Sequence, residues 1–204
     1  MEGRDPNSPL ATPSRQLEAS SWKLKRVKPK AFLNESGLYN YAVNALGRRM
    51  RTEAELRRLM RTRVEPGPRG EETIQAVISR LTEHHYLDDR TYAETYARLR
   101  RENEKLGQRS VRHALGQRGV SSTIVDQVVT ESYAKTDEET LARQYLERKR
   151  LRKPQNEKET ARVMRRLVGA GFSITVIHRI LRRWDVPEES LSALDNLEDE
   201  PQPD

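Results

Sequence analysis

The stretches LGQRGVSSTIVDQV at residues 115–128 and LVGAGFSITVIHRI at residues 167–180 decide the fold of this 204-residue chain. They align without a gap at a spacing of 52 residues. In each stretch a helical segment ends at a glycine, Gly119 or Gly171, and an apolar residue, a serine and an apolar stripe follow. Glycine readily adopts the left-handed conformation that ends many helices, and serine is a preferred N-cap of the next helix. The pattern therefore predicts a repeated helical unit.

The spacing of apolar residues predicts helices throughout the middle of the chain. Ile74, Val77 and Leu81, for example, lie at the i, i+3 and i+7 positions of one helical face. No segment alternates apolar and polar residues for long enough to predict a strand. The nine helices that we expect cover residues 38–49, 52–63, 71–85, 89–104, 108–118, 121–133, 137–152, 156–170 and 173–184.

Several of these helices begin at residues that are typical N-caps. Thr52 with Glu55, and Thr136 with Glu139, have the spacing of a capping box, in which each side chain accepts a backbone N–H of the other residue. Further predicted N-caps are Ser121 and Ser173.

The nine helices group in threes. In the first group, Leu56 and either Leu59 or Met60 take the places of Val111 and Leu115 in the second. A unit of about 50 residues buries little surface alone, so neighbouring units are expected to stack. The predicted fold is all-α, with three tandem three-helix modules forming an elongated, curved repeat between a disordered N-terminal arm and a disordered acidic C-terminal tail. The predicted limits are 1–35 for the arm, 36–87, 88–135 and 136–185 for the modules, and 186–204 for the tail.

Charge is distributed unevenly along the chain, whose formal net charge is +7. Residues 1–35 hold seven Lys or Arg and four Asp or Glu, whereas residues 186–204 hold seven acidic residues and no basic one. The middle of the chain has 31 basic and 20 acidic residues, a net charge of +11. A basic body favours a polyanion or an acidic protein surface as partner. The alternative is an arginine-rich helical surface that is simply solvated.

Composition argues against an enzyme. The chain has no cysteine, which excludes disulfides, zinc–thiolate sites and cysteine nucleophiles. Its four histidines and scattered serines form no triad or metalloprotease spacing. No apolar run of about 18 residues and no apolar N-terminal leader is present. We therefore expect a cytoplasmic, monomeric, non-enzymatic protein that needs no cofactor or metal and contacts no membrane.

A block at the junction of the first two modules resembles a known family. The block reads Tyr86, Leu87, Asp88, Asp89, Arg90, Thr91, Tyr92, Ala93, and it is followed by Tyr96, Lys105, Gly107, Val111, Leu115 and Gly119. The upstream residues Ala42, Leu46, Arg48, Arg49, Thr52, Glu55 and Leu56 fit the same pattern. Over residues 38–184 the chain resembles the RecX regulatory proteins. It departs from them at His84 and His85, where the family has an acidic residue and a glycine, so His85 must adopt a conformation that glycine would ease.

The resemblance implies a function. Proteins like RecX bind the RecA recombinase as its filament on single-stranded DNA, and they modulate, mostly inhibit, its ATPase and strand-exchange activities in homologous recombination, DNA repair and the SOS response. They lie in the filament groove, and several also bind DNA directly. The alternative from the basic composition alone is a stand-alone helical DNA-binding protein.

Arginines are the candidate contact residues, because a guanidinium can donate two parallel hydrogen bonds to a phosphate or a carboxylate. The alternative for each is a solvated face with intrahelical ion pairs. The predicted set is Arg48, Arg49, Arg57, Arg58, Arg61, Arg98, Arg101, Arg109, Arg112, Arg148, Arg150, Arg162, Arg165 and Arg166, and Arg179, Arg182 and Arg183 are further arginines of the third module.

The signature block offers two further candidates. Tyr86, Tyr92 and Tyr96 could stack on nucleobases, although their spacing favours packing in the core. Asp88 and Asp89 could form a metal or acid–base site with the nearby histidines, although their position favours capping of the following helix.

Overall fold

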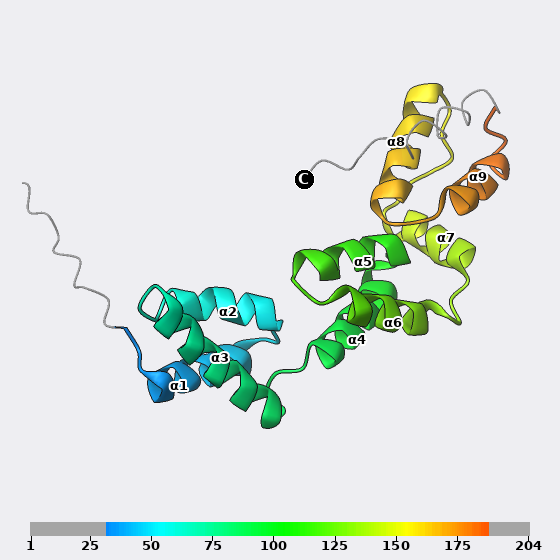
Figure 1. Ribbon diagram of the computed structural model, residues 1–204. Coiled ribbons are helices and arrows are strands. Elements are labelled where there is room, and N and C mark those ends of the chain that lie inside the picture. The colour runs from blue at the N-terminus through cyan, green and yellow to red at the C-terminus, as the bar shows by residue number, and fades with distance from the viewer. Residues whose placement is uncertain (1–31, 188–204) are drawn as a thin grey trace, which may run out of the picture. The chain divides into compact units, whose positions relative to one another are not determined.

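The computed structural model describes residues 32–187, and within that range the chain forms helices and loops without a strand, as the sequence predicts. The helices fall into three groups of three, called triplets 1, 2 and 3 below, which are blue to teal, green, and yellow to orange in Figure 1. The predicted arm up to residue 31 and the predicted tail from residue 188 lie outside the described residues. The curved form and the limits of the modules stay predictions. No helix of residues 32–187 has the length and apolar character needed to cross a membrane.

Triplet 1 consists of α1 (Glu35–Arg48), α2 (Glu53–Arg61) and α3 (Pro68–Glu83). Its own hydrophobic cluster joins the three helices, and Leu38, Leu56, Met60, Ile74 and Leu81 are fully buried there. These residues include the apolar stripe of α3 and the two positions, 56 and 60, that the repeat aligned with the second module.

Triplet 2 consists of α4 (Asp89–Leu99), α5 (Gln108–Gln117) and α6 (Ser122–Tyr133). The helix predicted over 89–104 continues past α4 as one π-helical turn, Arg100–Glu104, and ends at Lys105, which has a left-handed φ of 59°. The cluster of this triplet is built from small side chains, among them Ala93, Ala97 and Val129.

Triplet 3 consists of α7 (Glu138–Arg148), α8 (Glu157–Gly169) and α9 (Ile174–Arg182). Its cluster is centred on Phe172, which is 1% exposed and meets the ring of Tyr145 edge-on at 5.7 Å between centroids. Gly119 and Gly171, the two glycines of the repeat, have φ values of 79° and 87°, as expected for residues that end a helix in the left-handed region.

The capping predictions are confirmed in part. The Ser121 hydroxyl accepts the Ile124 N–H at 3.5 Å, and the Thr52 hydroxyl accepts the Glu55 N–H at 3.1 Å. The capping box also predicts that the Glu55 carboxylate accepts the Thr52 N–H. That part is wrong, because the Glu55 carboxylate instead accepts a hydrogen bond from Arg118 at 2.9 Å.

The capping box predicted at Thr136 is also wrong. Asp137 is the N-cap of α7 and accepts the Thr140 N–H at 2.9 Å. Ser173 does occupy the N-cap position of α9, but its hydroxyl donates to Glu138 at 2.8 Å instead of accepting from its own helix. At the start of α7 the acidic residue one position after the expected one is the cap, and at Ser173 a carboxylate from a distant part of the chain draws the hydroxyl away from its own helix; both form charge-assisted bonds.

Two similar joints connect the middle helices of successive triplets. At the first joint, the N-terminal end of α2 meets the C-terminal end of α5, where the Thr52 hydroxyl donates to the Arg118 carbonyl at 2.7 Å. At the second, the N-terminal end of α5 meets the C-terminal end of α8, where the Gly107 N–H donates to the Ala170 carbonyl at 2.8 Å. Each joint therefore sets a donor at one helix start, the Thr52 hydroxyl or the Gly107 N–H, against a free carbonyl at another helix end.

Glycines make both joints possible. A Cβ on Gly119 would lie 2.3 Å from the Ala54 Cβ, and a Cβ on Gly171 would lie 2.2 Å from the Ser110 backbone nitrogen. A Cβ on Gly107 would lie 2.3 Å from the Gly171 carbonyl oxygen. The helix ends approach more closely than any side chain would allow.

Candidate functional site

Two of the three α2 arginines in the predicted contact set, Arg57 and Arg61, bond to α3. Arg57 donates to Glu53 of its own helix at 2.8 Å and to Gln75 of α3 at 2.5 Å, whereas Arg61 donates to Glu71 of α3 at 2.7 Å. The hydrogen bond and attraction between Arg61 and Glu71 raise the pKa of Arg61 and lower the pKa of Glu71. Exposed ion pairs such as Arg61–Glu71 contribute little to stability because solvent screens them. An anionic partner could therefore replace these carboxylates at little cost.

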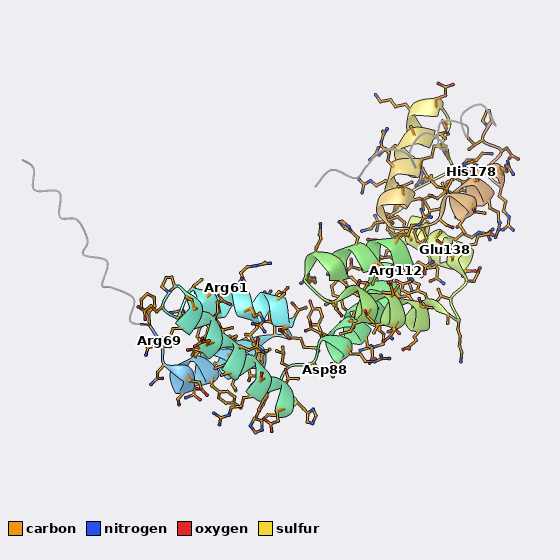
Figure 2. All side chains as sticks on the ribbon, in the orientation of Figure 1. Arg61, Arg69, Asp88, Arg112, Glu138 and His178 are labelled. Carbon is orange, nitrogen blue, oxygen red and sulfur yellow. The ribbon has the colours of Figure 1, made fainter. Side chains whose placement is uncertain are left out.

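In triplet 2 the contact set includes arginines that connect helices within the triplet. Arg101 is half-buried and donates to the Ser132 carbonyl at the end of α6. Arg112, labelled in Figure 2, lies on α5 with its Nε 3.4 Å from an Asp126 carboxylate oxygen of α6. Both side chains connect helices within triplet 2, so a partner could bind them only by displacing these contacts. Exposed members of the set in this triplet are Arg98 and Arg109.

The other predicted contact arginines lie exposed in triplets 1 and 3. Many are near helix C-terminal ends, where a cation is stabilised by the helix dipole without any partner. Their exposure leaves a partner free access to them. They are Arg48, Arg49 and Arg58 in triplet 1, and Arg148, Arg150, Arg162, Arg165 and Arg166 in triplet 3.

The three signature tyrosines have different environments. Tyr92 is 8% exposed and packs in the core of triplet 2, as predicted. Tyr96 is half-buried between the guanidinium groups of Arg100 and Arg118, which lie 4.7 and 5.1 Å from its ring centroid. Core packing is wrong for Tyr86, which is 56% exposed. The reason is local: the preceding His85 has a φ of 59°, as the sequence comparison predicted, and the chain turns there between α3 and α4.

Asp88 and Asp89 both act as helix caps, but on different helices. Asp88, labelled in Figure 2, accepts the Arg90 and Thr91 N–H groups of its own helix at 2.8 and 3.1 Å. The hydrogen bond from the Thr91 hydroxyl, followed by these two backbone bonds, lowers the pKa of Asp88. Asp89 accepts the Glu53 N–H at the start of α2 at 2.8 Å. Burial, and then nearby carboxylates, raise the pKa of Asp89. Both side chains are thus used in capping, and Asp89 connects the signature block to the first joint.

The sequence did not single out Arg118. Its backbone carbonyl accepts from Thr52, its guanidinium bonds Glu55, and the same guanidinium covers the Tyr96 ring. The aligned position in the repeat is Ala170, so the repeat gave no signal for an arginine with this role.

Known proteins that are similar to this chain in sequence are described as RecX proteins. The profile of the first three-helix domain of RecX matches residues 39–81, and the profile of the second three-helix domain matches residues 88–129. A regulatory protein RecX of Pseudomonas entomophila is 32% identical over 148 residues, which cover 71% of this chain and 90% of that protein. A regulatory protein RecX of Thermus thermophilus is 32% identical over 149 residues, with coverages of 73% and 91%. A longer RecX of Halalkalibacterium halodurans is 30% identical over 150 residues, which make up 54% of its length.

Solved structures support the same fold. The crystal structure of a regulatory protein RecX superposes with a TM-score of 0.60 at 21% identity, over 73% of this chain and 71% of that one. The crystal structure of RecX from Lactobacillus salivarius superposes with a TM-score of 0.57 at 22% identity, over 74% of this chain and 96% of that one.

Proposed function

Because this chain belongs to the RecX family of regulatory proteins, we propose that it binds the RecA recombinase filament on single-stranded DNA and lowers its ATP hydrolysis and strand exchange. The observation that carries the proposal is the match to RecX relatives across both the family profiles and 90% of a curated relative. In this role the protein acts in the cytoplasm as a monomer, without catalysis or cofactor, in recombination, DNA repair and the SOS response.

The exposed arginines support a binding surface of this kind. A filament of protein on nucleic acid offers both carboxylates and phosphates, and guanidinium groups bind either. Arg48, Arg49 and Arg58 lie exposed in triplet 1, and Arg162 and Arg165 lie exposed on α8. We propose that arginines of both triplets contact the filament.

The test is titration of the purified protein against RecA on single-stranded DNA, with ATP hydrolysis and co-sedimentation measured together. We expect hydrolysis to fall as the protein sediments with the filament. Unchanged hydrolysis without co-sedimentation would refute the proposal.

A matched pair of variants sharpens the test. Replacing Arg48, Arg49 and Arg58 with Gln should weaken inhibition, because exposed contact residues are lost. Replacing Arg90 with Gln removes an arginine that pairs with Glu94 and Glu131 within triplet 2, and it should leave inhibition unchanged.

A second candidate, stand-alone DNA binding, is favoured by the net charge of the middle of the chain, which has 31 basic and 20 acidic residues. Its affinity for single strands should then fall with salt with a log–log slope of about −0.7 per phosphate contacted. Absence of binding at moderate salt without RecA would reject this candidate and leave the first one standing.

A further inference from the structure

Three arginines of triplet 3 converge on one buried carboxylate. The Glu139 side chain on α7 is 11% exposed, and it pairs with Arg143 at 2.5 Å, Arg183 at 2.5 Å and Arg179 at 3.3 Å. Arg143 comes from α7, Arg179 from α9 and Arg183 from the residue after α9. We call Glu139 and these three arginines the arginine cluster.

The arginine cluster has more donors and more positive charge than its carboxylate can satisfy. Each guanidinium has five N–H donors, whereas one carboxylate accepts about four hydrogen bonds. The three arginines carry two more charges than Glu139 neutralises, although Asp137 also interacts with Arg179, and each arginine side chain remains 46–57% exposed. The carboxylate holds the guanidinium groups near one another, so the entropy lost on binding an anion is reduced. The oxygens of a phosphate can accept parallel hydrogen bonds from such guanidinium groups.

Two hollows flank the arginine cluster. Arg143 and Arg183 line a hollow of about 330 Å³ together with Leu151, Trp184 and Glu147. Arg179 and Arg183 line another of about 650 Å³, which lies along α9 beside His178, labelled in Figure 2. Arg183 borders both hollows, so a phosphate on the cluster would have space on either side of it.

The smaller hollow has the chemistry of a nucleobase site. Trp184 is half-buried against the core of triplet 3, and Leu151 offers an apolar wall. Stacking on an aromatic ring is how single-strand binding proteins hold bases without reading their sequence. Glu147 lies in the same hollow and would repel a phosphate there, which places the phosphate at the arginines and the base in the hollow. Bases of a duplex are paired and stacked, so they could not enter.

We propose that the arginine cluster and Trp184 form a binding site for single-stranded nucleic acid, in which a backbone phosphate lies on Arg143, Arg179 and Arg183 and an adjacent base stacks beside Trp184. This proposal rests on the second candidate function, stand-alone DNA binding, and deepens it by naming the residues that would hold a single strand. Arg179 and Arg183 are among the arginines of the third module that the sequence analysis named, whereas Arg143 is not.

The first experiment compares two variants that each remove one positive charge. Arg183→Gln lies in the site, whereas Arg69→Gln lies exposed at the start of α3 in triplet 1. The affinity of each variant for a labelled oligo(dT) of about thirty nucleotides is measured by fluorescence anisotropy in the absence of RecA. Arg183→Gln should lose about tenfold in affinity, the effect of one charge-assisted hydrogen bond, and should lower the salt slope by about 0.7. Arg69→Gln should stay within about twofold, and duplex affinity should not distinguish the two variants. Thermal melting of both variants checks that triplet 3 stays folded.

The second experiment observes the proposed stacking directly. Trp22 is the other tryptophan of the chain, so a Trp22→Phe background leaves Trp184 as the sole indole. Oligo(dT) should quench its fluorescence, and Trp184→Phe should retain most of the affinity that Trp184→Leu loses. Equal oligo(dT) affinities for Arg183→Gln and Arg69→Gln, or an unquenched Trp184, would overturn the proposal. If the unchanged protein binds oligo(dT) but the two arginine variants bind it equally, the site is refuted and stand-alone DNA binding still stands. Inhibition of RecA is measured separately and bears on the first candidate function alone.

Discussion

Gly119→Ala is the substitution that most directly tests the joint between α2 and α5. Gly119 has a φ of 79°, and its Cβ would lie 2.3 Å from the Ala54 Cβ. A side chain in the left-handed region costs about 1–2 kcal/mol. Carbon atoms need a separation of about 3.5–4.0 Å, so the two helix ends must also move apart by more than about 1 Å.

The movement would break the hydrogen bonds of the joint. The Thr52 hydroxyl bonds the Arg118 carbonyl at 2.7 Å, and the Glu53 N–H bonds Asp89 at 2.8 Å. Each contributes about 0.5–1.5 kcal/mol. Together with the backbone strain, Gly119→Ala should lower the free energy of unfolding by roughly 2–5 kcal/mol.

A double-mutant cycle separates the strain from the contact. Ala54→Gly alone should cost about 0.5–1 kcal/mol, because glycine weakens a helix. In the double variant the contact is gone, so the loss should be about 1–3 kcal/mol smaller than the sum of the two single losses. Gly116→Ala is the control: nothing lies within 4 Å of its Cβ, and it should stabilise the protein by about 0.4–1 kcal/mol.

Urea unfolding gives the free energies, and hydrogen exchange at α2 and α5 locates the change. If the effects of Gly119→Ala and Ala54→Gly add to within about 0.5 kcal/mol, the close approach of the two helix ends is refuted.

Further predictions concern the core, acid stability and the tail. Phe172→Ala should lower the free energy of unfolding by about 3–5 kcal/mol through the cavity it leaves in triplet 3, and a loss below about 1 kcal/mol in a urea titration would contradict the packing described. Asp88 and Asp137 have lowered pKa values, so each contributes stability that is present above the unfolded aspartate pKa of about 3.9 and is lost as pH falls through the folded pKa. In Asp88→Asn the urea midpoint should therefore decrease less, as the pH is lowered, than it does in the unchanged protein. An unchanged pH dependence of the midpoint would refute this. Asp89 has a raised pKa, so its contribution has the opposite sign: it is present at low pH and lost as pH rises through the folded pKa, and Asp89→Asn should remove that decline. Deleting residues 187–204, which hold seven acidic and no basic residues, should raise affinity for single-stranded DNA at low salt, and equal affinities of full-length and truncated protein would exclude shielding by this segment.

Local signals in the sequence predicted the helices and several of their ends. The periodicity of apolar residues requires only neighbours three or four positions apart, and it located every helix of residues 32–187 to within a few residues. The glycines at 119 and 171 and the cap at Ser121 likewise depend on the chain immediately around them. Such features follow from backbone geometry alone.

Contacts between distant residues could not be predicted in the same way. Asp89 caps a helix that starts 36 residues earlier, and Glu139 pairs with Arg179, 40 residues later. Both carboxylates lie near helix starts, where capping of their own helix is the default expectation. The charge pattern likewise could not distinguish Arg101, which bonds within its triplet, from the exposed Arg165, because the choice depends on which helix packs alongside.

The joints also give the chain a direction, because each middle helix offers donors at one end and acceptors at the other. The α5 helix receives donors from α2 at its last carbonyls and gives its own first N–H to α8. A unit of 52 residues could therefore be duplicated or excised during evolution with the surviving ends still matching, as long as the glycine of each acceptor end is kept. At the other terminus Leu33 donates to the Arg63 carbonyl just beyond α2, so the first acceptor end is already closed and new units would be added after α8 rather than before α2.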